Sequence, residues 1–474
     1  MAWMDILQCA YCGGPFQATR ATQSDPHPQY DILTCHCSRY PVVAGIPILK
    51  KGAIGYAEAT PDDVVHLIED GKDREALVCM LLPPFSSSPR LAPIWIQHLP
   101  SVKGMGRLQA LAHRRALTKW RQHIATILLD EHKTRSAFDL FPLLFQRGVY
   151  YFYFAYRFGQ PRHLAALSLT SIIHDPKKPL LDLACGVGHL TGTLTRRAGK
   201  QIAIGVDRAF VCLYMAKHWM APEAHYVCCD VDGALPFSGG AFSAVLCSDV
   251  VHDLSHKISV IRELQRLTQD DGVILLASMR NALVKQIDRF PSLLSPDGYR
   301  QLIAGMPHAL LPNSIIVSRY LQRLGPPLGA PPSGPKLGAA SLLSMVVAYN
   351  DAVLHDYGRF AEWPHAEEGR LLRVNPLYVE VENTGIGTGK KTLRRTFPSP
   401  QYEEENADCK EYLPETVELS TEVFNDLAMH RRSSEVERLI ERCVVLGMPR
   451  RYIDNEPLTA TQSEASGVFF RSAS

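Results

Sequence analysis

The sequence predicts an α/β protein in which a mainly parallel sheet is joined to a small cysteine-bearing domain at the N-terminus, with a helical segment between them. Three observations lead to this fold class. Apolar runs of four to six residues recur between residues 180 and 278, helix-forming or turn-forming stretches separate them, and four cysteines fall within the first 37 residues. Strands that alternate with helices are typical of a parallel sheet covered on both faces.

Five apolar runs supply the predicted strands. Their spacing of about 20 residues leaves room for one helix or turn between neighbours. The stretch 257–272 carries apolar side chains at three-residue spacing along one face, so it is predicted to be an amphipathic helix. The predicted strands lie at residues 180–183, 202–206, 225–229, 244–247 and 273–278.

The first run ends in a glycine turn, Cys185-Gly186-Val187-Gly188, and the second run ends in Asp207. Glycine lets the backbone approach a ligand without a Cβ in the way. An acid at the end of the next strand can accept hydrogen bonds from ribose hydroxyls. A dinucleotide fingerprint needs a third glycine at position 191, which is Thr191 here. The pattern therefore predicts a nucleoside-containing cofactor without a diphosphate.

The string LDLACGVGH, with Asp207 following, resembles motif I and the acidic loop of class I S-adenosylmethionine (SAM) methyltransferases. The usual first glycine of that motif is Ala184 here. Downstream, the order of acid, LPF, strand, helix with RELQRL and strand is similar to the group that includes the ubiquinone and menaquinone biosynthesis methyltransferases. The resemblance covers about residues 175–280. It implies a Rossmann-like class I methyltransferase sheet with an antiparallel last strand, and SAM as the methyl donor.

The resemblance also implies which residues surround the cofactor. Gly186 and Gly188 would admit its methionine and ribose end, and Asp182 would support the amino group or the glycine turn. Asp230 and Val231 match the positions beside the adenine ring. The expected cofactor-binding residues are Asp182, Ala184, Gly186, Gly188, Asp207, Arg208, Asp230, Val231 and Ser248.

Candidate catalytic residues follow the fourth predicted strand. Methyl transfer from a sulfonium is an in-line displacement, so the protein mainly excludes water and holds the nucleophile in line. A base is needed only if the nucleophile starts protonated. His252 is the first candidate because a near-neutral pKa suits that task, and Asp249 or Asp253 come next. His189 is a weaker candidate, and a packing or capping role for His252 is the open alternative.

The N-terminal cysteines are a second, separate signal. Cys9 and Cys12 form a Cys-x-x-Cys pair, and Cys35 and Cys37 form a Cys-x-Cys pair 22 residues later. Two close pairs are typical of one tetrahedral, structural zinc ion, in which His36 could replace a thiolate. The following SRYPVVAGIPILKKG is similar to the tail of small zinc-ribbon proteins that activate tRNA and release-factor methyltransferases. This resemblance implies a zinc-ribbon-like domain over residues 1–52.

The predicted domains continue with a helical lead-in over residues 53–174 and a SAM-binding core over 175–290. Ten of the 40 aromatic residues lie within 138–158, just before the first strand. The resembling methyltransferases place there a helix that closes over the cofactor, although core packing is the alternative for most of these rings. Residues 291–460 are expected to complete the sheet and the substrate site, and 461–474 to be a disordered tail.

Within that C-terminal region we expect a strand over 313–321, a helix over 342–360 and a linker over 325–340. The runs LYVEVE and TLRRTF are expected to form the antiparallel pair that finishes the central sheet. Residues 290–365 would then be an insertion that shapes the substrate site.

Composition limits the function further. The net charge of +2 gives no support for a strongly nucleic-acid-directed field. No apolar run is long enough for a membrane span, and the first residues lack a signal-peptide pattern, which indicates a cytoplasmic protein. Aromatic residues near the site favour a small-molecule methyl acceptor. The ribbon and the basic residues Arg114, Arg115, Lys119 and Arg121 leave an RNA methyltransferase as the alternative, and a non-catalytic SAM-binding scaffold as the third.

Overall fold

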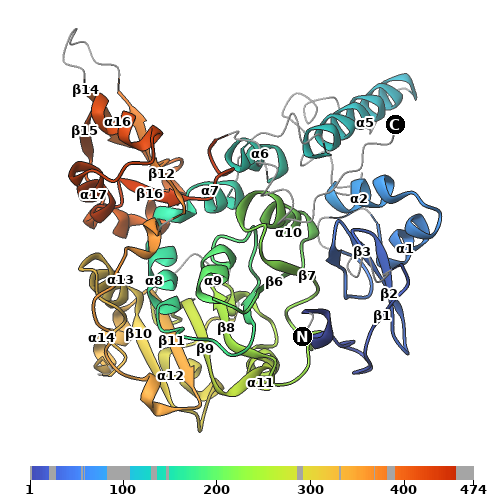
Figure 1. Ribbon diagram of the computed structural model, residues 1–474, viewed down its shortest axis with the longest axis horizontal. Coiled ribbons are helices and arrows are strands. Elements are labelled where there is room, and N and C mark those ends of the chain that lie inside the picture. Colours follow the sequence, from blue (N-terminus) through green and yellow to red (C-terminus); the bar gives the residue numbers. More distant parts are fainter. Residues whose placement is uncertain are drawn as a thin grey trace.

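A seven-stranded sheet in the order β10-β11-β9-β8-β5-β6-β7 forms the centre of the molecule (Figure 1). The computed structural model describes residues 3–20, 28–54, 57, 59–82, 107–129, 136–145, 149–284, 292–329, 332–367, 369–381 and 390–454. The strands are β5 (Leu180–Leu183), β6 (Ala203–Asp207), β7 (His225–Cys228), β8 (Phe242–Ser248), β9 (Thr268–Arg280), β10 (His308–Pro312) and β11 (Leu342–Ala348).

Five of these strands are parallel, since β5 pairs in parallel with β6 and β8, β6 with β7, and β8 with β9. Strand β11 is antiparallel to both of its neighbours, β9 and β10. The predicted α/β class, with a mainly parallel Rossmann-like sheet that ends in antiparallel pairing, is therefore confirmed.

The two faces of the sheet are buried by different helices. On β5, Leu180 joins one apolar core, whereas Leu181 and Leu183 join the other. The first core takes in α8 (Pro161–Thr170), α9 (Thr191–Arg197), α10 (Phe210–Met215) and α13 (Asn313–Leu321). The second takes in α11 (Lys257–Leu267) and α12 (Pro296–Leu302). Asp182 alternates with Leu181 and Leu183, so it lies on the α9 face.

The end of the central sheet differs from the prediction. Residues 313–321 form helix α13, and residues 342–348 form strand β11 inside the segment expected to be helical. Apart from Ser344, the run 342–348 is apolar on both faces, and such a run does not distinguish a central strand from a buried helix. In the run 313–321, the β-branched residues that suggested a strand are overruled by packing, because Ile316, Val317 and Tyr320 bury one helical face in the core.

The predicted hairpin is also elsewhere. Strands β13 (Tyr378–Glu380) and β14 (Lys390–Arg395) pair with β15 (Thr416–Ser420) in a separate sheet, so they do not finish the central one. Its last two strands are β10 and β11, which lie within the segment expected to be an insertion. Part of the expected linker is helix α14 (Gly334–Ala339). The loop between the hairpin strands lies largely outside the described residues, as does the predicted tail 461–474.

The N-terminal region is a four-stranded sheet in the order β1-β2-β3-β4, drawn in blue beside β7 in Figure 1. Helix α1 packs on β3. Next to β4, Ile48 bridges to Cys228, so this small sheet abuts the edge of the central sheet at β7. The elements are η1 (Trp3–Ile6), β1 (Gln17–Ala18), β2 (Asp31–Thr34), β3 (Arg39–Val43), β4 (Ile46–Pro47), α1 (Pro61–Glu69) and α2 (Asp73–Leu81).

The lead-in and the C-terminal region contact each other. The Tyr452 hydroxyl donates to the carbonyls of Phe154 at 2.9 Å and Ala155 at 2.8 Å, which ties the end of the described chain to the lead-in.

Among the described residues, no helix combines the length and the apolar content that a membrane crossing requires. The lead-in helices are α5 (Arg107–Leu129), α6 (Ala137–Leu144), α7 (Val149–Ala155) and η3 (Arg157–Gly159). The remaining elements are η4 (Ala216–Met220), η5 (Val251–Asp253), η6 (Asp351–Val353), η7 (Pro364–Ala366), β12 (Leu371–Val374), α15 (Pro400–Glu405), η8 (Ala407–Glu411), α16 (Thr421–Ala428), α17 (Ser434–Glu441) and β16 (Val445–Met448).

Candidate active site

The glycine turn follows β5 directly and holds its backbone in left-handed conformations. Ala184, Gly186 and Gly188 have φ angles of 56°, 54° and 84°. A Cβ added at Gly186 would lie 3.0 Å from Cε1 of Phe154, and one at Gly188 would lie 2.9 Å from Cβ of Ala216. Both glycines are therefore required by conformation and by space, while Ala184 adopts its left-handed φ despite its Cβ.

Backbone strain marks the same edge of the sheet at two further strands. Asp249, just after β8, and Ser278, near the end of β9, both have φ of 60°. With Ala184 after β5, three central strands each carry a left-handed residue other than glycine near their carboxyl ends. Such residues cluster at active sites, and ligands of open α/β sheets bind at this edge. The carboxyl edge of β5, β8 and β9 is therefore the candidate active site.

Asp207 joins the end of β6 to the glycine turn. Its Oδ2 accepts from the backbone N–H of Gly186 and its Oδ1 from that of Ala209, both at 2.9 Å. Burial raises the pKa of the Asp207 carboxyl, and these two backbone donors oppose that shift. Each carboxylate oxygen can accept more than one hydrogen bond. Both oxygens of Asp207 can therefore still accept hydrogen bonds from hydroxyl groups of a ligand.

Asp182 lies behind the turn and is held by Thr191. The Thr191 hydroxyl donates to Oδ2 of Asp182 at 2.6 Å. Burial raises the pKa of Asp182 to about 7, the negative charge of Asp207 adds to the shift, and the hydrogen bond from Thr191 opposes it. Asp182 can therefore be protonated or charged near neutral pH, and a cationic group bound nearby would favour the charged form.

The other expected cofactor residues follow β6, β7 and β8 at the same edge. Arg208 is exposed, Val231 is buried, and Asp230 accepts from Nζ of Lys50 at 2.6 Å. The Ser248 hydroxyl is buried without a hydrogen-bond partner in the described part of the chain. Buried polar atoms are usually paired, so this hydroxyl fits a site that a polar ligand completes. The sequence did not predict Lys50, which comes from the N-terminal region.

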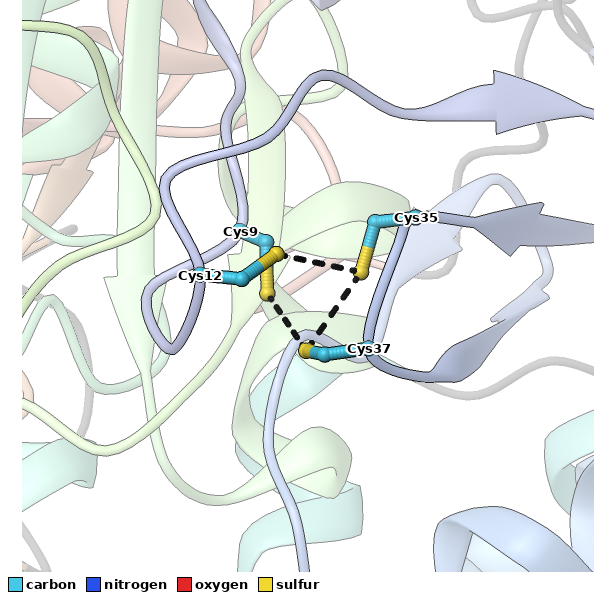
Figure 2. Close-up of side chains that lie close together, drawn as sticks. All are labelled: Cys9, Cys12, Cys35 and Cys37. Atoms are coloured by element: carbon cyan, nitrogen blue, oxygen red, sulfur yellow. Dashed lines mark hydrogen bonds between the residues drawn. The ribbon is translucent and has the colours of Figure 1, made fainter.

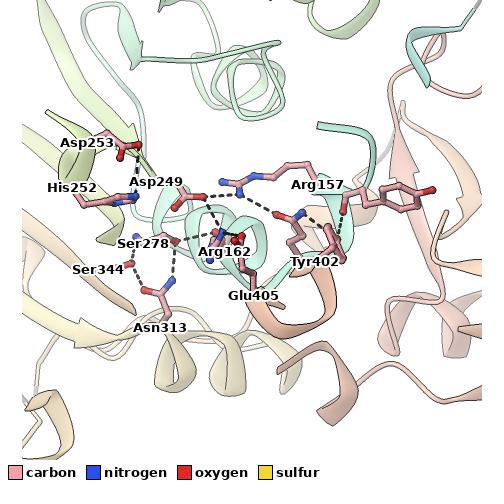
Figure 3. Close-up of polar contacts among 12 residues, drawn as sticks. Arg157, Arg162, Asp249, His252, Asp253, Ser278, Asn313, Ser344, Tyr402 and Glu405 are labelled. Carbon is pink, nitrogen blue, oxygen red and sulfur yellow. Dashed lines mark hydrogen bonds and ion pairs between the residues drawn. The ribbon is translucent and has the colours of Figure 1, made fainter. Parts of the chain in front are cut away.

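Asp249 is the centre of a buried ion pair (Figure 3). Its Oδ2 lies 3.0 Å from Nη1 of Arg157 and 3.7 Å from Nη1 of Arg162, and its side chain is 4% exposed. Burial alone would raise the pKa of Asp249, but the charges of Arg162 and Arg157 outweigh it and leave the pKa below its ordinary value. The carboxylate is therefore charged and a weak base. Sequence reasoning missed both arginines, because nothing in the lead-in marks them as its partners.

The remaining catalytic candidates are His252 and Asp253, which follow Asp249 in the chain, and His189. His252 is buried on η5, with Nε2 3.9 Å from Oδ2 of Asp253, whose side chain is half exposed. Burial lowers the pKa of His252, and the charges of Asp249 and Asp253 oppose that shift. His189 is also buried, and its Nε2 bonds the carbonyl of Phe154 at 3.0 Å. Burial lowers the pKa of His189 to about 3. The His189 imidazole is thus neutral and engaged in packing against the lead-in.

A polar network fixes the strained part of β9. The Ser278 hydroxyl accepts from Nδ2 of Asn313 at 2.8 Å, and the Ser344 hydroxyl donates to Oδ1 of Asn313 at 2.7 Å. The backbone N–H of Ser278 donates to the Ser344 hydroxyl at 3.0 Å. Asn313 lies on helix α13 and Ser344 on strand β11, so these two elements help to shape the site (Figure 3).

A cavity of about 280 Å³ adjoins the Asp249 ion pair. Arg162 lines it and lies between Asp249 and Glu405, at 3.9 Å from Oε2 of the latter. Nε of Arg162 and Oδ1 of Asn406 are buried without hydrogen-bond partners among the described residues. Aromatic rings and further polar groups complete the wall, and the lining residues are Phe152, Tyr153, Gln160, Arg162, Ser399, Pro400, Gln401, Tyr402, Glu405 and Asn406.

The four predicted metal ligands come together in the N-terminal region (Figure 2). The sulfurs of Cys9 and Cys37 are 3.6 Å apart, those of Cys12 and Cys35 3.8 Å, and those of Cys35 and Cys37 3.7 Å. A tetrahedral ion with metal–sulfur bonds of about 2.3 Å separates its sulfurs by about 3.8 Å, whereas a disulfide needs about 2.05 Å. The cluster therefore has the dimensions of a four-thiolate metal site.

Comparison with known proteins places a methyltransferase domain in the same part of the chain. Residues 181–276 match the family model described as a methyltransferase domain. A malonyl-[acyl-carrier protein] O-methyltransferase of Legionella pneumophila is 28% identical over 109 residues, which are 23% of this chain and 38% of that protein. The mitochondrial ubiquinone biosynthesis O-methyltransferase of Mus musculus is 28% identical over 121 residues, 23% of this chain and 32% of that protein. The chain thus matches about a third of the length of these curated relatives.

Solved structures are similar at lower identity. The plantazolicin methyltransferase BpumL in complex with SAH is 13% identical, with 48% of this chain and 99% of that chain covered at a TM-score of 0.34. A TehB-like SAM-dependent methyltransferase from Corynebacterium glutamicum is 15% identical, with 39% and 86% covered at a TM-score of 0.27.

Proposed function

We propose that the protein is a SAM-dependent methyltransferase that binds its donor at the carboxyl edge of β5 to β8 and its acceptor beside Asp249. One observation carries the proposal. The turn at Ala184, Gly186 and Gly188 is tied to Asp207 by a hydrogen bond from the backbone N–H of Gly186 to the Asp207 carboxylate, within the segment that matches the methyltransferase domain. When bound, SAM supplies a methyl group that already carries its leaving group.

Each residue predicted to bind the methyl donor has a role that its surroundings support. Asp207 would accept from ribose hydroxyls with the lone pairs that its two backbone donors leave. Asp182 would face the amino group or hold the turn through Thr191, and Asp230 and Val231 would flank the adenine. The buried Ser248 hydroxyl would gain the hydrogen bond that it lacks among the described residues.

Of the three catalytic candidates, His252 is the base that we favour for an acceptor that starts protonated. Its lowered pKa keeps the imidazole neutral at pH 7, so it can take up a proton. Asp249 is instead a positioning residue, because its carboxylate is committed to Arg157 and Arg162. Asp253 would act only through His252.

The acceptor is a small molecule in this proposal. A cavity of about 280 Å³ with aromatic walls suits a compact organic ligand. The unpartnered Nε of Arg162 would donate to it, and Oδ1 of Asn406 would accept from it. Of the basic residues that suggested RNA, Arg115 and Lys119 are exposed whereas Arg121 is buried, so Arg121 would not belong to an RNA-binding surface.

The four cysteines would hold a structural Zn²⁺. All four ligands come from the protein, so no coordination position is left for chemistry. The ion would close the two knuckles of the N-terminal sheet. Location in the cytoplasm stays a prediction.

Calorimetry with S-adenosylhomocysteine (SAH), the demethylated form of SAM, tests the donor site. Asp207→Ala should weaken SAH binding by at least about tenfold, since two ribose hydrogen bonds to a charged group are lost. Asp271→Ala is the matched control, because Asp271 is an exposed aspartate near the other end of β9. Absence of SAH binding to the wild type would refute the enzyme class, and unchanged affinity in Asp207→Ala would refute the ribose assignment.

A further inference from the structure

The N-terminal region makes hydrogen bonds at both ends of the loop that carries Asp230 and Val231. On one side, the backbone N–H of Leu49 donates to the carbonyl of Cys228 at 2.8 Å, next to the bridge between Ile48 and Cys228. On the other side, the N–H of Gln8 donates to the carbonyl of Pro236 at 3.0 Å, and its side chain donates to that of Phe237 at 2.7 Å. Both ends of the loop are therefore held by the region that bears the cysteine cluster.

Two consecutive lysines lie shortly after β4, and their side chains point in different directions. Lys50 points into the central domain, with its side chain only 6% exposed, and Nζ donates to Oδ1 of Asp230 at 2.6 Å. Lys51 points to the cysteines, with Nζ 3.9 Å from the sulfur of Cys37 and 4.6 Å from the centre of the Tyr11 ring. One short segment therefore touches both sites.

The cysteine loop is linked to this segment a second time. The backbone N–H of Lys51 donates to the Tyr11 hydroxyl at 3.0 Å, and the N–H of Tyr11 donates to the sulfur of Cys9 at 3.4 Å. A chain of contacts therefore runs from Cys9 and Cys37 through Tyr11 and Lys51 to its neighbour Lys50.

The contacts of Lys50 and of Lys51 both depend on the charge of their partners. A buried ammonium is tolerated only with a partner, so Lys50 needs Asp230 and in turn fixes its carboxylate. Four thiolates around Zn²⁺ carry a net charge of about −2, which a nearby ammonium such as that of Lys51 stabilises. Without the metal the two knuckles lose their closure, and the segment that positions Lys50 loses its anchor.

We propose that Lys50 is a positioning residue for the cofactor site, and that metal binding by the four cysteines strengthens cofactor binding through the segment Ile48–Lys51. The inference rests on the proposed function, because it concerns the same donor site. Linkage requires the reverse effect as well: the cofactor must tighten metal binding by the same factor.

Calorimetry with SAH on the full chain tests the role of Lys50. Lys50→Met keeps the apolar stem but removes the ammonium, and it should weaken SAH binding to the zinc-loaded protein by about 5- to 50-fold. Lys72→Met is the matched control, because Lys72 pairs with Asp70 on the exposed surface of the same region. Its SAH affinity should stay within about twofold of the wild type.

Zinc affinity measures the coupling without relying on a variant. Competition with a chromophoric chelator should show that saturating SAH raises the zinc affinity of the wild type by about 5- to 50-fold. The same addition should leave the zinc affinity of Lys50→Met nearly unchanged, because the contact that joins the sites is gone.

The outcomes separate the two proposals. A wild type that does not bind SAH refutes the proposed function. A wild type that binds SAH, with a zinc affinity that SAH does not alter, overturns the inference and leaves the proposed function standing. Equal SAH affinity of Lys50→Met and the wild type also overturns it. If Lys50→Met does not fold, the wild-type zinc measurement alone decides.

Discussion

The donor side and the acceptor side of the site are built in different ways. Donor residues follow strand ends within 182–248, and most of their tasks belong to the backbone turn and to single carboxylates. The acceptor side joins groups that are far apart in sequence, for example Gln160 and Tyr402, which are 242 residues apart and form a 3.1 Å hydrogen bond. The donor side can therefore be recognised from local sequence, whereas the acceptor side forms only when distant segments fold together.

This difference predicts that damage to one side should leave the other largely intact. The substitutions and pH conditions below each act on one of the two sides, and the first acts on the acceptor side.

Arg157→Met should have the largest effect on stability. It leaves the Asp249 carboxylate buried beside Arg162 alone, and breaking a buried pair in this way costs about 3–5 kcal/mol. Denaturant unfolding measures the loss. Arg300→Met is the control, since its pair with Asp297 is exposed and should contribute at most about 0.5 kcal/mol. A loss below 1 kcal/mol for Arg157→Met would contradict the buried-pair description.

Gly188→Val should abolish donor binding. The left-handed backbone and the 2.9 Å approach of Ala216 exclude a branched side chain, so SAH affinity should fall by at least about 100-fold. Gly199→Val is the control, because Gly199 is also left-handed but has no atom within 4 Å of an added Cβ. It should lose some stability and retain SAH binding. Equal affinity losses in the two variants would show that the turn has no special role.

Asp182 should make donor binding depend on pH. The pKa of Asp182 is about 7 in the free protein. Below pH 7 the Asp182 carboxyl must therefore lose its proton when a cationic amino group binds beside it. SAH affinity should therefore fall by up to about tenfold per unit as the pH drops below 7, and should level off above it. Asp182→Asn should remove this slope. Calorimetry in two buffers of different ionisation enthalpy detects the released proton, and a flat wild-type profile from pH 6 to 8 would refute the assignment.

The same shift predicts how stability changes with pH. The ordinary pKa of an aspartate is about 3.9, so between about pH 4 and pH 7 the folded protein holds a proton that the unfolded chain has lost. The contribution of Asp182 to the free energy of unfolding therefore decreases as the pH rises through this window.

Tyr402→Phe should have the smallest effect. The variant loses hydrogen bonds at 3.1 Å to Gln160 and at 3.2 Å to the carbonyl of Tyr156, which should cost about 1 kcal/mol of stability. SAH affinity should not change, because these contacts lie on the acceptor side. A clear loss of SAH binding would break the proposed separation of the two sides.

The sequence predicted the parts of the molecule in which local chemistry is decisive. The five parallel strands and the clustering of four cysteines are confirmed. The central sheet also has the predicted antiparallel pairing at its end, but β10 and β11 form it in place of the predicted hairpin strands. The glycine turn could be predicted because its backbone needs glycine at Gly186 and Gly188 whatever surrounds them.

Other parts depend on packing and were wrong or missed. The run 342–348 is apolar except for Ser344 and gives no clear period, so its strand was predicted to be part of a helix. The hairpin at 378–395 has strand propensity, but propensity does not say which sheet it joins. Lys50 and Arg157 look like ordinary surface cations in the sequence, and only the fold brings them to Asp230 and Asp249.

Hydrogen exchange with and without SAH tests the central claim most directly, because it reads the donor site residue by residue in the unmodified chain. Saturating SAH is expected to slow exchange of the backbone amides at 184–190, 207–209 and 229–231, and to leave those at 393–420 unchanged. Protection confined to other segments, or no protection anywhere at saturating SAH, would contradict a donor site at the carboxyl edge of β5 to β8.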